Sequence, residues 1–474
     1  MSDPLWARSI DTLAPDIRDG KLSAVRVIET ALERIDALDG RINAFICRAP
    51  DPLGAARAAD RDIRAGKWRG PLHGLPVAIK DNYFTADMPT TAGTSAAGIE
   101  FPKRDSACVA KLRAAGAIPI GKTRTHEFAW GNVTPPTRNP WDLDRVPSGS
   151  SGGSGAAVAA RLCVAGTGSD TGGSIRMPAA VCGTVGFKPT FGRVSREGIV
   201  PHTWSLDHAG PLTRCVADAA HMLNVLAGYD AADPGSRDEP VPDYTQALSQ
   251  SVKDVRIGIC RRHFFEGNQE DVEHAVERAV DDLAAQGARI VEFDMPLLEY
   301  GLGAVFAIEL ASSTAYHDVS LREHRTQEFQ PDVRSLVEIG RFVTGADYLK
   351  AEQYRWLLME AFRDVFASVD IVLTPTMPLT AWKVGEWTVP VGGREESVLS
   401  ASWRFTYPFN LTGLPAISVP CGFDRGHLPI GLQLAGKPFD ELTVLRVAHA
   451  YEREHDWHLR VPAVASAESS ARSA

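Results

Sequence analysis

Two clusters of glycine and serine, both within residues 148–178, constrain this chain more than any other feature of its sequence. The first reads Ser-Gly-Ser-Ser-Gly-Gly-Ser-Gly from Ser148, and the second reads Gly-Ser-Asp-Thr-Gly-Gly-Ser from Gly168. Glycine permits positive φ and lets main-chain N–H groups approach a ligand closely, and consecutive N–H groups can form an anion-binding nest. A serine within such a cluster, as at Ser150 and Ser174, suits acyl transfer, because a nucleophile then lies beside donors for an oxyanion.

A candidate base lies upstream, at Lys80. It follows the short apolar run Val77-Ala-Ile79, which predicts a buried strand with the lysine at its end. Desolvation lowers the pKa of a lysine from roughly 10.4, so that its amine can accept a proton. A lone lysine at a strand end is more often a solvated charge, so this prediction depends on the two downstream clusters.

Together these residues resemble the catalytic motif of the amidase signature family of serine hydrolases. The resemblance implies that Lys80 is the base, that Ser150 follows a cis peptide bond and relays a proton, and that Ser174 is the nucleophile. A Ser–Lys arrangement is a known variant of the serine triad. One departure is visible, since the family usually has Gly-Gly before the Ser-Ser pair and this chain has Ser148 first.

The neighbours of the three residues receive supporting roles. Candidate oxyanion donors are the backbone N–H groups of Thr171, Gly172, Gly173 and Ser174. We expect the hydroxyl of Ser151 to hold the first loop. Asp170 and Arg176 are expected to brace the second loop through charged hydrogen bonds rather than to take part in the chemistry.

The resemblance covers most of the chain and implies its fold. It returns at Gly186–Thr190 and again at Asn410–Pro415. We expect an α/β fold: one large domain over residues 1–463, with a mixed sheet covered by helices on both faces, and a disordered tail over 464–474. The implied activity is hydrolysis of a small-molecule amide to an acid and ammonia or an amine. The resemblance implies no cofactor and no metal, and it makes a homodimer possible.

Expected helices include residues 23–40, 53–66, 304–315 and 346–367, from their apolar spacing or composition. A helix over 155–161 is expected to lead into a strand at 162–165. Residues 382–396 are expected to form an exposed loop.

Gly149–Gly153 also fits G-x-S-x-G, the nucleophile elbow, which would make Ser151 the nucleophile. That motif needs an apolar strand directly before it. Residues 139–147 instead contain two prolines and read as a loop, which disfavours the elbow.

Gly116–Thr123 matches the phosphate-loop pattern, but its middle residues are apolar and Pro119 lacks the N–H that such a loop needs. A strand is favoured there. A Ser-His-Asp triad through His202, Asp207 or His208 is also disfavoured, because Asp207 and His208 are adjacent and would point to opposite sides of a regular strand.

Composition limits the partners. The 474 residues carry a net charge of −9, which disfavours nucleic acid or an anionic membrane as the main partner. No apolar run approaches the roughly 18 residues of a membrane-spanning helix, and the N-terminus has no signal-peptide pattern, so the cytoplasm is expected. The seven cysteines include no Cys-x-x-Cys pair, so neither a zinc site nor a disulfide framework is indicated.

Two other functions remain open. In the amidase subunit of a tRNA-dependent amidotransferase, an aspartate and an arginine hold glutamine, and the matching positions here appear as Trp403 and Leu336. This favours a free-standing amidase with a less polar pocket, and the aromatic residues over 403–409 favour an apolar acyl group. A non-catalytic binding protein is disfavoured, because Lys80, Ser150 and Ser174 are all present.

Overall fold

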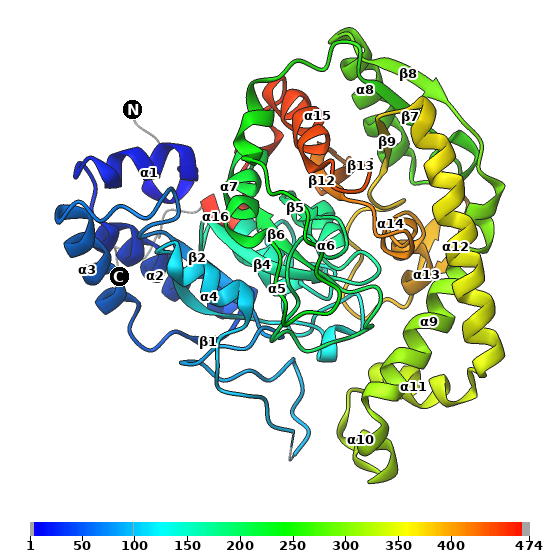
Figure 1. The fold of residues 1–474 in the computed structure, drawn as a ribbon, viewed down its shortest axis with the longest axis horizontal. Helices are drawn as coiled ribbons and strands as arrows, with labels where there is room; N and C mark the ends of the chain where they lie inside the picture. Colours follow the sequence, from blue (N-terminus) through cyan, green and yellow to red (C-terminus); the bar gives the residue numbers. More distant parts are fainter. Residues whose placement is uncertain (1–3, 98, 467–474) are drawn as a thin grey trace.

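A mixed sheet runs through the computed structural model, which describes residues 4–97 and 99–466 (Figure 1). Within these residues the sheet has eleven strands. Their order is β1 (Phe45–Arg48), β3 (Ile118–Thr123), β2 (Pro76–Lys80), β4 (Ala165–Asp170), β6 (His208–Thr213), β5 (Val185–Lys188), β12 (Ala416–Phe423), β13 (Pro429–Gly436), β9 (Ile371–Pro375), β7 (Arg256–Ile259) and β8 (Arg289–Glu292).

The directions of the strands determine which strand ends meet at the candidate site. β2 runs parallel to β3 and β4, while β4, β6, β5, β12, β13 and β9 pair antiparallel in turn. Val77 lies opposite Ala165 in the β2–β4 register. The carboxyl ends of β2 and β4 therefore meet at the same edge of the sheet, which brings Lys80 and Asp170 to one place.

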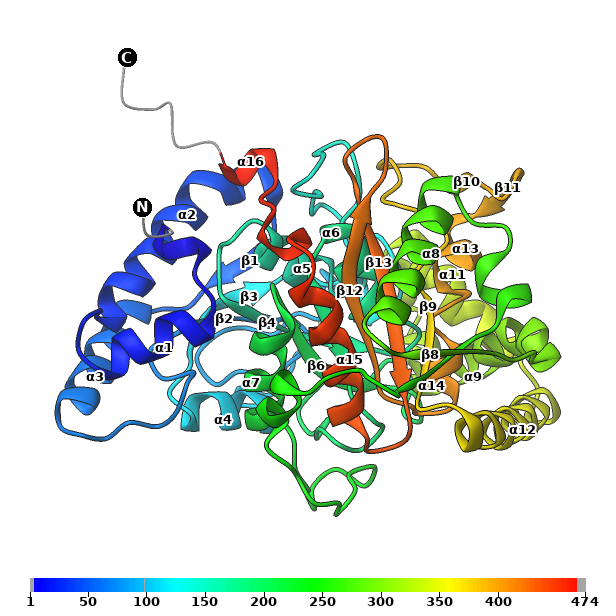
Figure 2. The same cartoon turned by 90° about the horizontal axis from the view of Figure 1, so that it is seen from above.

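Helices cover both faces of the sheet, as expected. They are α1 (Ile10–Arg18), α2 (Ala24–Ile42), α3 (Pro52–Arg64), α4 (Ala107–Ala114), α5 (Gly152–Ala159), α6 (Arg176–Cys182), α7 (Val216–Leu226), α8 (Glu270–Ala285), α9 (Gly301–Tyr316), α10 (Asp318–Arg322), α11 (Pro331–Ile339), α12 (Gly345–Ser368), α13 (Val398–Trp403), α14 (Pro408–Leu411), α15 (Glu441–Arg453) and α16 (Ala463–Ser466). Figures 1 and 2 show α1–α3 at one end of the molecule and α9–α12 at the other. The α/β class and the mixed sheet are confirmed.

Several helices begin at residues whose side chains cap them. The side chain of Ser23 accepts the backbone N–H of Arg26 at the start of α2. Thr344 and Asp347 form a reciprocal capping box at the start of α12. The helices expected over 23–40, 53–66, 304–315 and 346–367 are confirmed as α2, α3, α9 and α12.

Two short helices that carry the glycine and serine clusters, α5 and α6, are buried along their whole length. Small residues let α5 pack closely against neighbouring backbone. A Cβ added at Gly153 would lie 2.5 Å from the carbonyl oxygen of Arg124 and 2.7 Å from that of Ala44. Glycine is therefore required there by the close approach of two backbone segments.

Three expectations about elements need correction. The strand after α5 is Ala165–Asp170, not residues 162–165, because a tight turn follows α5 first. Residues 382–396 are not simply an exposed loop, since Trp382 is buried and β10 (Thr388–Val391) pairs with β11 (Arg394–Ser397). The two-residue turn at Gly392-Gly393, with positive φ at both, explains that hairpin.

The third correction concerns the end of the chain. Ala463–Ser466 form α16, so the first residues of the expected disordered tail, 464–466, are helical. The rest of that tail lies outside the described residues.

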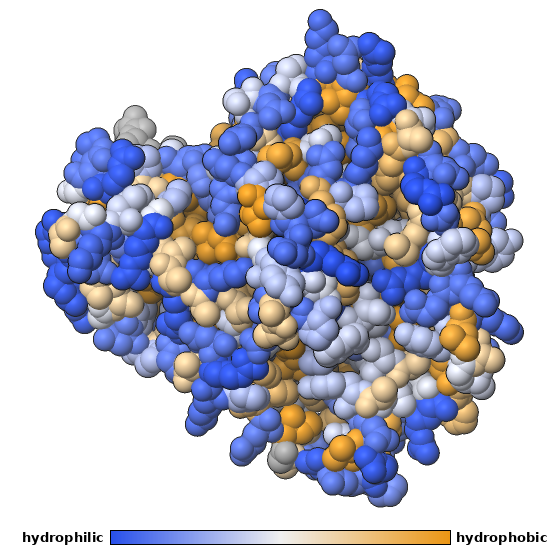
Figure 3. Space-filling model, viewed as in Figure 1, coloured by the Kyte–Doolittle hydropathy of each residue, from blue (hydrophilic) through white to orange (hydrophobic). Residues whose placement is uncertain are grey.

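Hydrophilic side chains cover most of the face seen in Figure 3, and small apolar patches lie between them. Within residues 4–97 and 99–466, no helix combines the length and the apolar character needed to cross a membrane.

Candidate active site

Lys80 is the last residue of β2, and its side chain is completely buried. Its Nζ lies 2.8 Å from Oγ of Ser150 and 2.9 Å from Oγ of Ser169. Burial lowers the pKa of Lys80 to about 7, although Asp170 and Asp207 attract its positive charge. A neutral amine at this position can donate to Ser169 while it accepts the proton of Ser150.

Ser150 lies in the loop before α5 and is also fully buried. A cis peptide bond joins it to Gly149, as the resemblance predicted. Its carbonyl oxygen accepts the backbone N–H of His126 at 3.1 Å and the hydroxyl of Thr134 at 3.2 Å. These contacts fix the backbone that presents the Ser150 hydroxyl to the lysine.

Ser174 lies in the turn between β4 and α6, and 6% of its surface is exposed. Its carbonyl oxygen accepts the backbone N–H of Ser151 at 3.2 Å, while Oγ of Ser151 donates to the carbonyl of Ser169 at 3.2 Å. The second glycine and serine cluster therefore lies directly against the first, and Ser151 joins the two loops.

The turn that precedes Ser174 offers unused backbone donors. Among the described residues, the N–H groups of Gly172, Gly173 and Ser174 have no hydrogen-bond acceptor. The carbonyl oxygen of Gly172 accepts the hydroxyl of Thr406, which holds the turn from the other side. Free backbone N–H groups next to a serine are donors that can stabilise an oxyanion.

Asp170 and Arg176 form a completely buried ion pair beneath this turn. Nε and Nη2 of Arg176 donate to the two carboxylate oxygens of Asp170 at 3.0 and 2.9 Å. Arg176 also donates to the side chains of Gln433 and Asn410. Burial alone would raise the pKa of Asp170, but the Arg176 guanidinium holds it well below its usual range. The pair ties α6 and β4 to residues of α14 and β13.

The histidines of the alternative triad make different contacts. Asp207 accepts hydrogen bonds from Thr171 Oγ1 at 2.6 Å and from the backbone N–H of His202 at 2.9 Å. Nδ1 of His208 lies 2.6 Å from a backbone carbonyl oxygen. Burial lowers the pKa of His202 to about 3, and the pKa of His208 is also well below its usual value for the same reason. A His–Asp catalytic pair is not formed by these contacts.

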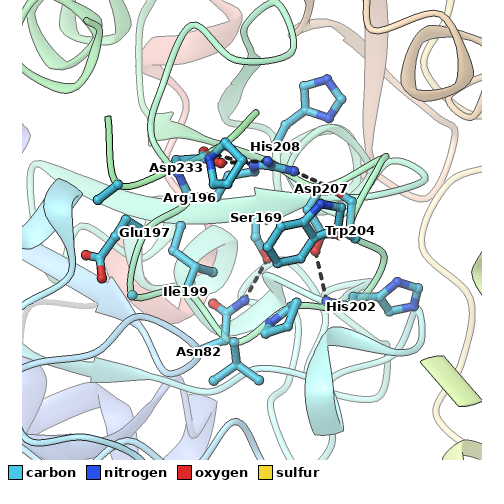
Figure 4. A pocket seen from close by; sticks show the side chains of 15 residues that line it. Asn82, Ser169, Arg196, Glu197, Ile199, His202, Trp204, Asp207, His208 and Asp233 are labelled. Atoms are coloured by element: carbon cyan, nitrogen blue, oxygen red, sulfur yellow. Dashed lines mark hydrogen bonds and ion pairs between the residues drawn. The ribbon is translucent and has the colours of Figure 1, made fainter. Parts of the chain in front are cut away.

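A cavity of about 220 Å³ reaches Ser169, one of the two partners of Lys80. Asn82 donates to Oγ of Ser169 at 3.0 Å, as Figure 4 shows. The ion pair between Arg196 and Asp233 also lines this cavity. The cavity therefore approaches Lys80 and Ser150 from the side of Ser169.

Stacked aromatic rings form a wall beside the turn that carries Gly172 and Ser174. Trp403 stacks on Trp130, with ring centroids 5.9 Å apart, and on Phe306 of α9, with centroids 5.2 Å apart. A Cβ added at Gly172 would lie 3.8 Å from the Trp403 ring. The aromatic residues over 403–409 belong to α13, α14 and the turn between them.

Several residues of this site had no role in the sequence-based predictions. Ser169 is within the second cluster, and Asn410 begins the Asn410–Pro415 segment of the resemblance, so both were visible as part of a motif. Asn82 ends the Pro76–Asn82 segment of the same resemblance, which also implies that the segment with Trp130 lines the acyl pocket. Gln433 carried no such signal. Among the described residues, no group of three or more histidine, cysteine, aspartate or glutamate side chains could hold a metal ion.

Comparisons with known proteins agree with this geometry. The family Amidase matches residues 26–445. The chain is 44% identical to an amidase of Pseudomonas putida, over 95% of this chain and 96% of that protein. It is 42% identical to a glutamyl-tRNA(Gln) amidotransferase subunit from Chloroflexus aggregans, over 94% and 96% of the two chains.

One solved structure, of a vestigial protein complex related to the origins of an s-triazine catabolic enzyme, superimposes with a TM-score of 0.90. It is 34% identical in sequence, and the match covers 94% of this chain and 98% of that chain. The match of family, relatives and fold extends over nearly the whole chain. The chain therefore belongs to the amidase family and is a hydrolase that acts on the C–N bonds of amides.

Proposed function

We propose that this protein is a free-standing amidase that works through an acyl-enzyme on Ser174. The hydroxyl of Ser174 attacks the amide carbonyl and passes its proton to Ser150, whose own proton goes to the neutral amine of Lys80. The backbone N–H groups over 171–174 donate to the oxyanion. One observation carries this proposal: the buried Lys80 Nζ lies 2.8 Å from Ser150 Oγ, with a pKa lowered to about 7 by burial.

The same relay completes the cycle in reverse. Lys80, now protonated, returns the proton through Ser150 to the leaving nitrogen, the C–N bond breaks, and ammonia or an amine departs. Water then attacks the Ser174 ester, its proton enters the relay, and the acid leaves as Ser174 recovers its hydrogen. Asp170 and Arg176 support this chemistry by holding the turn, without touching the substrate.

The second candidate is the amidase subunit of a glutamine-dependent amidotransferase, a function named for several relatives. Trp403 is the residue that argues against it. This buried indole occupies the position at which that subunit is expected to carry an aspartate for glutamine, and its ring stacks on two other aromatic rings. A non-catalytic binding protein is disfavoured by the intact contact between Lys80 and Ser150.

We also propose a homodimer, which the family resemblance makes possible. Light scattering of the purified chain measures its mass in solution. Twice the mass of one chain is expected, and the mass of a single chain would contradict this proposal.

Ammonia release from a panel of amides tests the main proposal. The panel contains glutamine, indoleacetamide, benzamide, short aliphatic amides and biuret, and the Ser174→Ala variant is the blank. We expect the wild type to release ammonia from an aryl or alkyl amide. Ser174→Ala should abolish this release, and Ser150→Ala should leave only a small residual activity. Full activity in Ser174→Ala would overturn the proposal, and release from glutamine alone would favour the amidotransferase.

A further inference from the structure

Glu309, on the inner side of α9, is a buried carboxyl group with no role in the relay. Its side chain is completely buried. Among the residues that the structure describes, neither of its carboxylate oxygens has a hydrogen-bond partner. Burying a polar group without a partner is costly, and such groups are rare in folded proteins. A hydrogen-bond donor from outside the described residues would therefore stabilise this carboxyl group.

The position of Glu309 indicates where that partner binds. A Cβ added at Gly172 would lie only 3.2 Å from Oε1 of Glu309, and 3.8 Å from the ring of Trp403. Gly172 belongs to the turn whose free N–H groups face the reacting carbonyl in our proposal. The carboxyl group is thus beside this turn, on the side that a short acyl group of a substrate bound there would have to approach for the two to meet.

The charges around Glu309 favour a cation. Burial raises the pKa of Glu309 well above its usual value, and the negative charges of Asp207 and Asp170 raise it further. Asp170 is matched by Arg176, but Asp207 is held by hydrogen bonds from Thr171 and nearby backbone rather than by a direct ion pair. The raised pKa favours the neutral, protonated carboxyl group while the site is empty. A positive group bound beside Glu309 would displace that proton to solvent, pair with the carboxylate and be attracted by the other acids.

The neighbouring aromatic rings favour the same ligand. Phe306 lies one turn before Glu309 on α9 and stacks on Trp403, which in turn stacks on Trp130. Aromatic rings attract cations electrostatically, and tryptophan does so most strongly. A desolvated carboxylate beside aromatic rings is a suitable environment for an ammonium group.

We propose that Glu309 binds a protonated amino group on the acyl part of the substrate, one or two carbons from the scissile carbonyl. The preferred substrates are then amides of amino acids rather than amides with a purely apolar acyl group. This inference rests on the proposed amidase function and gives it a substrate class. It changes the expectation drawn from the aromatic residues over 403–409, because a buried carboxyl group and the Trp403 ring both lie beside Gly172.

Matched pairs of amides test this subsite. Glycinamide and propanamide differ only in an ammonium in place of a methyl group, and so do β-alaninamide and butanamide. We expect the wild type to have a higher kcat/KM for the cationic member of at least one pair. Glu309→Gln, which keeps the shape and removes the charge, should lower kcat/KM for that member at least tenfold, mainly through KM, and leave the neutral member nearly unchanged. Glu299→Gln, at an exposed glutamate, is the matched control.

Two results would overturn the inference while leaving the proposed function intact. The first is a wild type that prefers the neutral member of both pairs, with turnover that depends on Ser174. The second is an equal loss for both members in Glu309→Gln, which would indicate a structural role.

Calorimetry with Ser174→Ala separates this inference from the proposed function, because it measures binding without turnover. We expect glycinamide or β-alaninamide to bind Ser174→Ala, and to lose that binding when Glu309→Gln is added. If no amide is hydrolysed and a fluorophosphonate fails to label Ser174, the proposed function fails. Binding of glycinamide or β-alaninamide that depends on Glu309 would still support the subsite, and the absence of binding by both would overturn it.

Discussion

Lys80 is the residue whose ionisation should control turnover. Burial lowers its pKa to about 7, and only its neutral amine can accept the proton that Ser150 passes on. We therefore expect kcat/KM to rise with pH up to about 7 and to level off above it. A pH–rate profile on a substrate without an ionisable group measures this, and a flat profile from acid to alkaline pH with intact protein would contradict it.

Lys122 provides a matched control for Lys80. It is also a buried lysine, on the neighbouring strand β3, but its Nζ pairs with Asp81 at 3.2 Å. Lys80→Met should abolish turnover at every pH. Lys122→Met should lower stability, because it leaves a buried carboxylate without its partner, yet the folded fraction should keep the same pH profile.

Arg176 is expected to matter for stability through its buried pair with Asp170. Arg176→Met leaves the Asp170 carboxylate buried and uncompensated, which should lower the free energy of unfolding by about 3–5 kcal/mol. Urea unfolding measures this change. Asp170→Asn combined with Arg176→Met should recover part of the loss, since it removes the uncompensated charge. A single variant within about 0.5 kcal/mol of the wild type would contradict the prediction.

Whether a site residue could be predicted depended on its distance from a motif. Ser150 and Ser174 lie within dense local patterns, and Lys80 ends an apolar run, so the sequence was sufficient to single them out. Glu309 reaches Gly172 only because α9 packs against the turn in three dimensions. No local pattern marks such a residue, because its sequence neighbours on α9 resemble those of any buried helix.

In the proposed mechanism, the chemistry depends most directly on the turn between β4 and α6. Gly173 has φ of +141°, and a Cβ there would lie 2.3 Å from Oγ1 of Thr406. Gly173→Ala should therefore displace the turn and misalign its N–H donors. We expect kcat to fall about 10²–10³-fold, the usual effect of losing an oxyanion donor.

Steady-state kinetics measure this loss, and circular dichroism confirms that the variant folds. Gly303→Ala is a suitable control, because a Cβ at this position on α9 meets nothing within 4 Å. It should keep full activity. Unchanged kcat in Gly173→Ala would show that the turn tolerates the displacement and that its donors are not needed.

Helices with strong hydrophobic periodicity or clear capping residues were predictable from the sequence. Strands that are defined by pairing with another segment were not. α2 and α12 have clear start signals in Ser23 and Thr344. The β10–β11 hairpin has only one pair of short strands, and its signal was the two glycines at 392–393 rather than an apolar pattern. β4 consists largely of small residues, Ala-Gly-Thr-Gly-Ser-Asp, so that hydrophobicity placed the strand too early.

At the scale of the molecule, strand order decides which residues meet. β12 and β13 come late in the chain, yet they lie between β5 and β9 in the sheet. This insertion brings Gln433 to Arg176, and α14 brings Asn410 to the same guanidinium. Alternating strands and helices indicated the α/β class, but local sequence cannot specify an order that arises from long-range pairing.

The N-terminal helices should unfold together with the sheet, because contacts tie them to distant segments. The backbone N–H of Ile10 donates to Asp218 of α7 at 2.8 Å, and Arg34 of α2 donates to the carbonyl of Ala465 at 3.0 Å. Ile28 of α2 is completely buried, so Ile28→Ala should lower the free energy of unfolding by about 2–5 kcal/mol.

Urea unfolding followed by circular dichroism and by residual amidase activity tests this coupling. For Ile28→Ala, both signals should shift to the same lower urea concentration, since loss of α2 packing would destabilise the sheet that holds Lys80. Ile339→Ala, at a position that is 52% exposed, should change the free energy of unfolding by less than about 0.5 kcal/mol. Helical signal that disappears while activity persists would instead mean that α1–α3 unfold as an independent unit, and that the single domain expected over residues 1–463 is divided.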